Sequence, residues 1–234
     1  MHGWGEWETL YFYIGLIRGG GVTALVNTGP PHDLADLNAA WRQFAGPRCQ
    51  MLRGPTETVD ALLLRAGVRA EEVTHLLLTP LQLYATANIA MFPKAEICIS
   101  RRGWIEDIVE RLPWLHVPRD MCISRQTLAY LQGEARSRFR LLDAEERVCP
   151  GIEAAWIGTH HRSSVLYMVT TSRGKVGLSD CAFKYGNLIG HPLGIGESLA
   201  EGYAAYTRIQ REVDHFIPLY DPDVLERYPD GIIA

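Results

Sequence analysis

The chain has 234 residues, of which 47% are hydrophobic and 21% are charged, and this balance is typical of a globular protein rather than a disordered one. Its 23 lysine and arginine residues stand against 27 aspartate and glutamate residues, which gives a net charge of −4. Since no basic stripe of the kind that neutralises a phosphate backbone is present, nucleic acid is not expected as a partner.

The first predicted element is a β-hairpin. Residues 8–18 are rich in aromatic and β-branched types, and residues 22–27 resume an apolar run after three glycines. Glycine reaches the positive φ that a tight turn needs, so the two runs are predicted to pair. A helix capped by Asp33 and a second one over 58–66 follow, and short apolar runs then predict buried strands over 73–79 and 95–100.

The middle of the chain, residues 101–146, mixes helical stretches with two prolines and is predicted to be a helical insertion. Strands are expected again after it, at 153–157, 164–171 and 175–178. The longest helical pattern covers 197–211, and a final strand is expected at 215–219. This order of elements predicts one domain of the α/β (α+β) class, in which helices cover the sheets.

Cysteine usage and hydropathy bear on the compartment. The five cysteines are scattered, odd in number and free of any CxxC pair, which suits reduced thiols. No run approaches the roughly 18 apolar residues of a membrane span, and the N-terminal residues have neither the basic nor the apolar region of a secretion signal. We therefore expect a cytoplasmic protein with no membrane partner.

The segment from Thr79 to Pro93, TPLQLYATANIAMFP, follows a predicted buried strand. It resembles the T-H-x-H-x-D-H-x-G-N…F-P stretch of the metallo-β-lactamase superfamily, in particular of the acyl-homoserine-lactonase-like subgroup. Other landmarks of that superfamily occur in the same order: LVNTG at 25–29, GTHHRSS at 158–164, GLSDCA at 177–182 and IPLYDP at 217–222. The resemblance implies an αββα sandwich of two sheets flanked by helices, formed as a single domain over residues 1–234.

The resemblance also implies where metal ligands should stand. The seven ligand positions of the family fall on Pro80, Gln82, Tyr84, Ala85, His160, Asp180 and Tyr220. Only the imidazole of His160 and the carboxylate of Asp180 are usual zinc ligands. We therefore expect no bound cofactor and no metal site of the family's two-zinc type. A single metal held by His160, Asp180 and either His161 or Cys181 is the alternative.

A hydrolytic site without metal can still be assembled from these positions. His160 would act as a general base oriented by Asp180, with Ser163 or Ser164 as the nearest hydroxyl nucleophile. Tyr220 and Tyr84 would donate hydrogen bonds to a substrate carbonyl. The remaining candidates for substrate binding are Gln82, His161, Arg162 (as an anchor for an anion) and Ser164. The opposing interpretation is that His160 and Asp180 only satisfy each other and that the tyrosines fill the volume of the lost ions.

Two functions follow. The first is a divergent hydrolase that acts on a small lactone, ester or amide with no metal or at most one. The second is a catalytically inactive structural or regulatory subunit, in a homo- or hetero-oligomer with an active chain of the same fold. The aromatic N-terminal residues Trp7, Tyr11 and Tyr13 would offer apolar surface for such an interface. A hydrolase predicts an open pocket around His160 and Asp180, whereas a partner subunit predicts a filled cleft.

Overall fold

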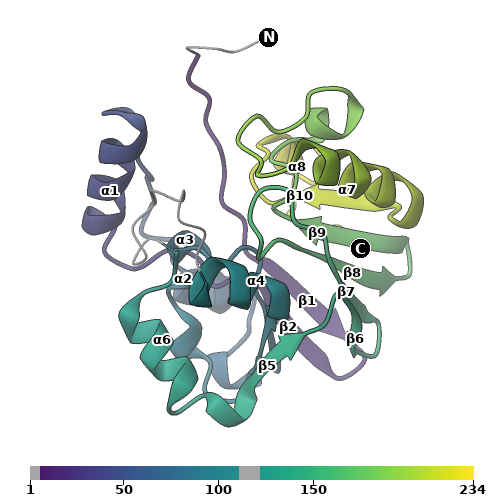
Figure 1. Ribbon diagram of the computed structural model, residues 1–234. Helices are drawn as coiled ribbons and strands as arrows, with labels where there is room; N and C mark the ends of the chain where they lie inside the picture. Colours follow the sequence, from purple (N-terminus) through teal and green to yellow (C-terminus); the bar gives the residue numbers. More distant parts are fainter. Residues whose placement is uncertain (1–5, 111–121) are drawn as a thin grey trace.

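The computed structural model describes residues 6–110 and 122–234, and its strands form two five-stranded sheets (Figure 1). The first sheet has the order β1-β2-β3-β4-β5 and the second has the order β10-β9-β8-β7-β6. The strands of the first sheet are β1 (Gly15–Gly19), β2 (Val22–Val26), β3 (His75–Leu77), β4 (Glu96–Ser100) and β5 (Phe139–Leu142). Those of the second are β6 (Glu145–Cys149), β7 (Ile152–Trp156), β8 (Val165–Thr171), β9 (Gly174–Ser179) and β10 (His215–Pro218).

The helices lie outside the two sheets (Figure 1). The α-helices are α1 (Ala35–Ala45), α2 (Val59–Arg65), α3 (Leu83–Thr86), α4 (Arg101–Gly103), α6 (Arg125–Gln132), α7 (Leu199–Glu212) and α8 (Asp223–Arg227). A π-helical turn, η3 (Trp104–Val109), continues α4. Short 3-10 turns occupy η1 (Ala70–Glu72), η2 (Ile89–Met91), η4 (Arg136–Arg138) and η5 (Tyr185–Ile189).

Because side chains alternate between the two faces of each strand, the buried apolar residues form three layers, one between the sheets and one on the outer face of each sheet. In β8, Tyr167 packs between the two sheets, while Leu166 and Met168 face α7. In β4, Cys98 faces the other sheet, while its neighbours Ile97 and Ile99 pack toward the helices. Because successive side chains of a strand point to opposite faces, each central strand contributes to two layers. The αββα sandwich implied by the family resemblance is therefore the observed architecture.

The predicted hairpin forms, but it is shorter than the sequence pattern indicates. β1 and β2 pair antiparallel from Gly15 opposite Val26 to Gly19 opposite Val22. The residues before Gly15 have no partner in β2, which begins at Val22 and ends at Val26. Two of their amides bond instead to the chain beyond β10, Tyr11 to the Tyr220 carbonyl (3.0 Å) and Tyr13 to the Leu219 carbonyl (3.1 Å). The aromatic residues of the N-terminus thus lie in an extended segment and not in the hairpin.

The prediction of a helical insertion over 101–146 is wrong for its last part. α4, η3 and α6 are helical, but Phe139–Leu142 forms β5, which pairs parallel with β4 as the last strand of the first sheet. Glu145 then opens β6, which pairs with β7. Arg140 and the exposed charges around it hide the apolar alternation of this region, so the sequence pattern does not indicate a strand. Residues 111–121 of the predicted insertion lie outside the described residues.

The remaining elements agree with the sequence patterns to within a few residues. α1 begins two residues after Asp33, whose side chain accepts a hydrogen bond from the amide of Ala35 at 2.9 Å. Gly67 follows α2 at a φ of 64°, as expected for a glycine that ends a helix. No helix within residues 6–110 and 122–234 is long and apolar enough to cross a membrane.

Candidate functional site

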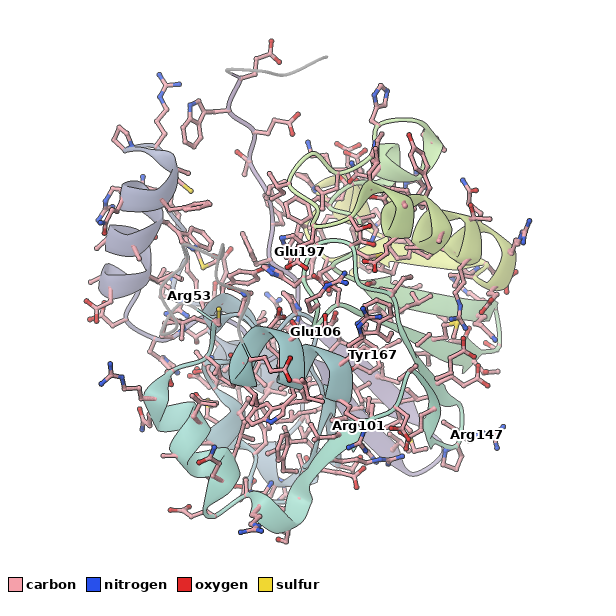
Figure 2. The ribbon with its side chains drawn as sticks, viewed as in Figure 1. Arg53, Arg101, Glu106, Arg147, Tyr167 and Glu197 are labelled. Carbon is pink, nitrogen blue, oxygen red and sulfur yellow. The ribbon has the colours of Figure 1, made fainter. Side chains whose placement is uncertain are left out.

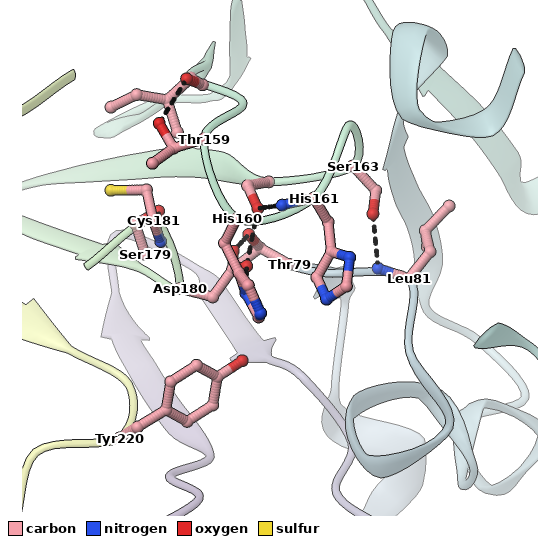
Figure 3. A network of polar contacts seen from close by, with 12 residues as sticks. Thr79, Leu81, Thr159, His160, His161, Ser163, Ser179, Asp180, Cys181 and Tyr220 are labelled. Carbon is pink, nitrogen blue, oxygen red and sulfur yellow. Dashed lines mark hydrogen bonds and ion pairs between the residues drawn. The ribbon is translucent and has the colours of Figure 1, made fainter. Parts of the chain in front are cut away.

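Four chain segments bring the predicted site residues together. Residues 79–84 follow β3, residues 158–164 follow β7, Asp180 follows β9 and Tyr220 lies two residues after β10. Figure 3 shows His160 between Asp180 and His161, with the hydroxyl end of Tyr220 facing the pair. The collinear motifs of the sequence therefore meet at one place in the fold.

Asp180 is fully buried and its carboxylate is bonded from three sides. Oδ2 accepts the Ser164 hydroxyl at 2.6 Å and faces the His160 Nδ1 at 3.0 Å. Oδ1 accepts the hydroxyl of Thr79. Because a carboxylate only accepts hydrogen bonds, Nδ1 is the protonated nitrogen of His160 and Nε2 is left as the basic one.

His160 is enclosed by rings. The His161 ring lies 3.9 Å away between centroids, and Phe183 meets His160 edge-on at 4.6 Å and 89°. His160 is only 7% exposed. The pKa of His161 lies well below the usual histidine value, mainly because the ring is buried and to a lesser extent because of the charge interaction with His160. His161 is therefore neutral at pH 7. The two adjoining imidazoles are thus enclosed by other side chains and do not form a base on the protein surface.

Five aromatic side chains, Phe12, Trp41, Tyr84, Phe183 and Tyr220, here called the aromatic cluster, occupy the space beside His160. Tyr220 meets Phe183 at 4.7 Å and Phe12 at 5.0 Å between ring centroids. Phe12 also meets Tyr84 at 5.0 Å, and the Tyr220 hydroxyl donates to the Tyr84 hydroxyl at 3.3 Å. Burial raises the pKa of both phenols, so both stay protonated. The two tyrosines at positions where the resemblance implies metal ligands therefore bond each other.

The two candidate nucleophiles are engaged elsewhere. The Ser163 hydroxyl accepts the amide of Leu81 at 2.9 Å, and its own amide donates to Asp107 at 2.9 Å. The Ser164 hydroxyl donates to Asp180 and accepts the His161 amide at 3.1 Å. Both serines are fully buried. Neither hydroxyl forms a described hydrogen bond with His160. The serine-to-histidine hydrogen bond through which a proton would be transferred is therefore not formed in this structure.

Two predicted substrate-binding residues also have protein partners. Gln82 is buried before α3, and its amide nitrogen lies 3.7 Å from the Cys122 sulfur. The Arg162 guanidinium forms ion pairs with Glu197, at 2.7 Å, and with Glu201. A third carboxylate, that of Glu106, lies 3.8 Å away. Figure 2 shows Glu106 and Glu197 close together near the middle of the molecule. Since these carboxylates already surround Arg162, the structure does not offer it as an anchor for a substrate anion.

Sequence reasoning missed three residues of the site. Thr79 bonds Asp180 directly, and its position at the end of the β3 strand, next to the family-like motif, is the signal that could have identified it. Phe12 and Trp41 enter the aromatic cluster from the N-terminal segment and from α1, with their rings 5.7 Å apart. Nothing in their sequence spacing relates them to residues near 84 or 220.

The residues present do not fit the two-zinc site that the family resemblance implies. Proline and alanine stand at two ligand positions, and a phenol binds zinc only as phenolate, which the raised pKa values of Tyr84 and Tyr220 disfavour. Within the described part of the chain, no three His, Cys, Asp or Glu side chains are grouped so that they could hold a metal ion. The alternative site of His160, Asp180 and His161 or Cys181 is not assembled either.

Two hollows among the described residues lie away from this cluster. One of about 280 Å³ lies beside Trp156 and Arg102, and one of about 250 Å³ lies beside Tyr185 and Arg227. Neither is lined by His160, Asp180 or Tyr220. The rings of the aromatic cluster occupy the space in which an open pocket was expected for a hydrolase.

No protein-family model and no curated protein sequence matches this chain. Solved structures do. An N-acyl homoserine lactone hydrolase with N-hexanoyl-L-homoserine bound at its catalytic metal centre is 14% identical, with a TM-score of 0.69 over 93% of this chain and 83% of that one. AidC, a dizinc quorum-quenching lactonase, is 16% identical, with a TM-score of 0.62 over 91% and 73%.

A Thermotoga maritima protein assigned to the metallo-β-lactamases is 13% identical, with a TM-score of 0.57 over 89% of this chain and 94% of that one. At such identities the likeness concerns the fold. The chain therefore has the metallo-β-lactamase fold, which confirms the predicted αββα sandwich.

Proposed function

We propose that this chain is a non-catalytic member of the metallo-β-lactamase fold, with a structural or regulatory role beside an active chain of that fold. The observation that supports this best is the packing of the site. Asp180 is fully buried and bonds the side chains of Thr79, His160 and Ser164. The aromatic cluster packs against the His160 ring through Phe183. Side chains that pack and bond in this way act as core residues.

Stability measurements distinguish a core from an active site. Removing a catalytic base costs turnover, whereas removing a core residue costs folding free energy. We expect His160→Ala to lower the free energy of unfolding by about 1–3 kcal/mol, because Asp180 loses a buried partner. Tyr220→Ala should cost about 3–5 kcal/mol through the cavity that it leaves. Chemical denaturation measures both, with the exposed Tyr203→Ala as a control that stays near the wild-type value.

Metal-independent hydrolysis is the second candidate, and the 3.0 Å contact between His160 and Asp180 favours it. That contact leaves Nε2 of His160 as a base, the arrangement used in metal-free hydrolases. Assays on N-acyl homoserine lactones, aryl esters and cyclic amides test it directly. Turnover by the wild-type chain that His160→Ala abolishes would contradict the non-catalytic role. Turnover unchanged in His160→Ala would exclude His160 as the base.

A partner role predicts an assembly. Light scattering after size-exclusion chromatography should show a mass above 26.2 kDa, either for the chain alone or after mixing with an active chain of the same fold from the same genome. Trp7 and Tyr11, which are 49% and 42% exposed, provide apolar surface for this contact. A monomer in both experiments, at concentrations up to 100 µM as an order of magnitude, would count against a partner role.

A further inference from the structure

We propose that residues 8–14, here called the N-terminal strap, are a gate over the aromatic cluster, and that the open gate exposes a binding site for a small planar aromatic molecule. The strap lies outside every helix and strand. It runs between α1 and the end of the molecule that carries α8 (Figure 1). The site that it would uncover is assigned neither by the fold nor by the proposed non-catalytic role.

The strap is held by few bonds. Its described backbone hydrogen bonds to the rest of the chain are those of the Tyr11 and Tyr13 amides, to the carbonyls of Tyr220 and Leu219. The Tyr13 hydroxyl donates to the Asp221 carbonyl at 3.0 Å, and Glu8 pairs with Lys184 at 2.6 Å on the surface. Its apolar side chains Leu10, Phe12 and Tyr13 are only partly buried against the core between the sheets. Because local opening follows local bonding and burial, a short extended segment held in this way can open without the sheets unfolding.

Phe12 is the part of the strap that fills the site. It is half-buried, and its ring contacts Trp41 at 5.7 Å, Tyr84 at 5.0 Å and Tyr220 at 5.0 Å between centroids. These three rings belong to α1, α3 and the chain after β10, which all lie outside the strap. Opening the strap therefore removes a phenyl ring from among rings that other elements carry.

The chemistry of the ligand follows from the ring that it replaces. The vacated space has the width of a phenyl ring and is lined by a tryptophan and two tyrosines, which favour edge-to-face contact with another flat ring. The phenols of Tyr84 and Tyr220 are protonated and share one bond of 3.3 Å, so they can also bond a single polar group on the ligand. The charge of the nearby Asp180 acts on both phenols and disfavours an anion, and no base is exposed among the rings to pair with a cation, so a neutral molecule is expected.

Amide hydrogen exchange of the full-length chain tests the gate, with indole as the planar probe. We expect the Tyr11 and Tyr13 amides to exchange at least 100-fold faster than the Tyr167 amide in the centre of β8. We also expect excess indole to accelerate exchange at residues 11 and 13 alone, because a ligand of the open state raises its population. The gate would be overturned if the Tyr11 and Tyr13 amides exchanged only through unfolding of the whole molecule, or if indole did not change their exchange rates.

Two variants separate a gate from an ordinary core residue. Phe12→Ala should bind indole at least tenfold more tightly than the wild type and should speed exchange at residues 11 and 13, with the β8 amides unchanged. Phe12→Leu, which keeps apolar volume, should lie between the two. Phe44→Ala, at a position that is 76% exposed on α1, serves as the control and should match the wild type. A uniform loss of protection across all amides in Phe12→Ala, or no gain in indole binding, would overturn the gate.

Discussion

Side chains at the positions where the family resemblance implies metal ligands bond one another in this chain. The carboxylate of Asp180 and the imidazole of His160 lie 3.0 Å apart. Tyrosines at two other positions bond each other instead of a metal. These four side chains therefore have polar partners within the chain, as buried polar groups require.

Glu197 carries a prediction about pH. Burial, and then the charge of Asp107, raises the pKa of Glu197 to about 7, although Arg162 lies 2.7 Å away. The folded chain therefore holds a proton on Glu197 between about pH 4.5 and 7 that the unfolded chain has released. The free energy of unfolding should fall as pH rises through this window. Glu197→Gln cannot ionise, so its stability relative to the wild type should increase from pH 5 to pH 8, by on the order of 2 kcal/mol.

Urea denaturation of the wild type and of Glu197→Gln at a series of pH values measures this difference. Taking the difference removes the opposite trend of His161, whose lowered pKa costs stability below about pH 6.5. The exposed Glu71→Gln in η1 is the control and should show no trend. A constant difference between pH 5 and 8 would mean that Glu197 is ionised in the folded chain throughout.

At the scale of elements, the loop that carries His160 is held by its contact with α4. Ser100 at the end of β4 caps this turn, and its hydroxyl accepts the Gly103 amide at 3.1 Å. Gly103 lies so close to the loop that a Cβ atom there would be 2.2 Å from the Cα of Ser163. The absence of a side chain at Gly103 is thus what allows the turn and the loop to touch.

Gly103→Ala is therefore expected to destabilise the protein by about 3 kcal/mol, because a backbone atom must move to admit the methyl group. Gly103 has ordinary helical angles, with a φ of −62°, so backbone strain does not contribute. Gly186→Ala is the matched control, since a Cβ there meets nothing within 4 Å. Thermal denaturation compares the two variants. Equal melting temperatures would show that the loop moves away from α4 without cost.

For the whole molecule, the sequence supports prediction of the frame more fully than of the site. Buried strands such as β3 and β4 can be predicted from the sequence, because parallel strands covered on both faces consist of continuous apolar runs. The strand β5 cannot be predicted in this way, since Arg140 interrupts its apolar pattern. Arg140 forms ion pairs with Glu96 and Glu146 at the edge of the sheet. The pairing of His160 with Asp180 follows from motif order. The entry of Phe12 into the site does not, because it depends on contacts between residues more than 70 positions apart.

The same contrast leads to a prediction about zinc. A ligand that binds only the folded chain raises its stability by RT ln(1 + [L]/Kd), so a zinc enzyme melts at a lower temperature once its metal is removed. Here most positions where the resemblance implies ligands hold side chains that are not usual zinc ligands, and the described residues form no group of three ligands. We expect purified chain to hold well under one zinc ion, and its melting temperature to be equal in EDTA and in micromolar zinc.

Metal analysis by mass spectrometry and calorimetry in the two solutions measure these quantities, and His160→Ala shows whether any residual zinc lies at the site. Two stoichiometric ions that EDTA removes with a drop in melting temperature would contradict the interpretation of a replaced site. A gain-of-function variant provides the positive control, because five of the seven positions where the resemblance implies ligands hold other residues. Zinc binding and zinc-dependent melting should appear when five family ligands are restored together, as P80H, Q82H, Y84D, A85H and Y220H.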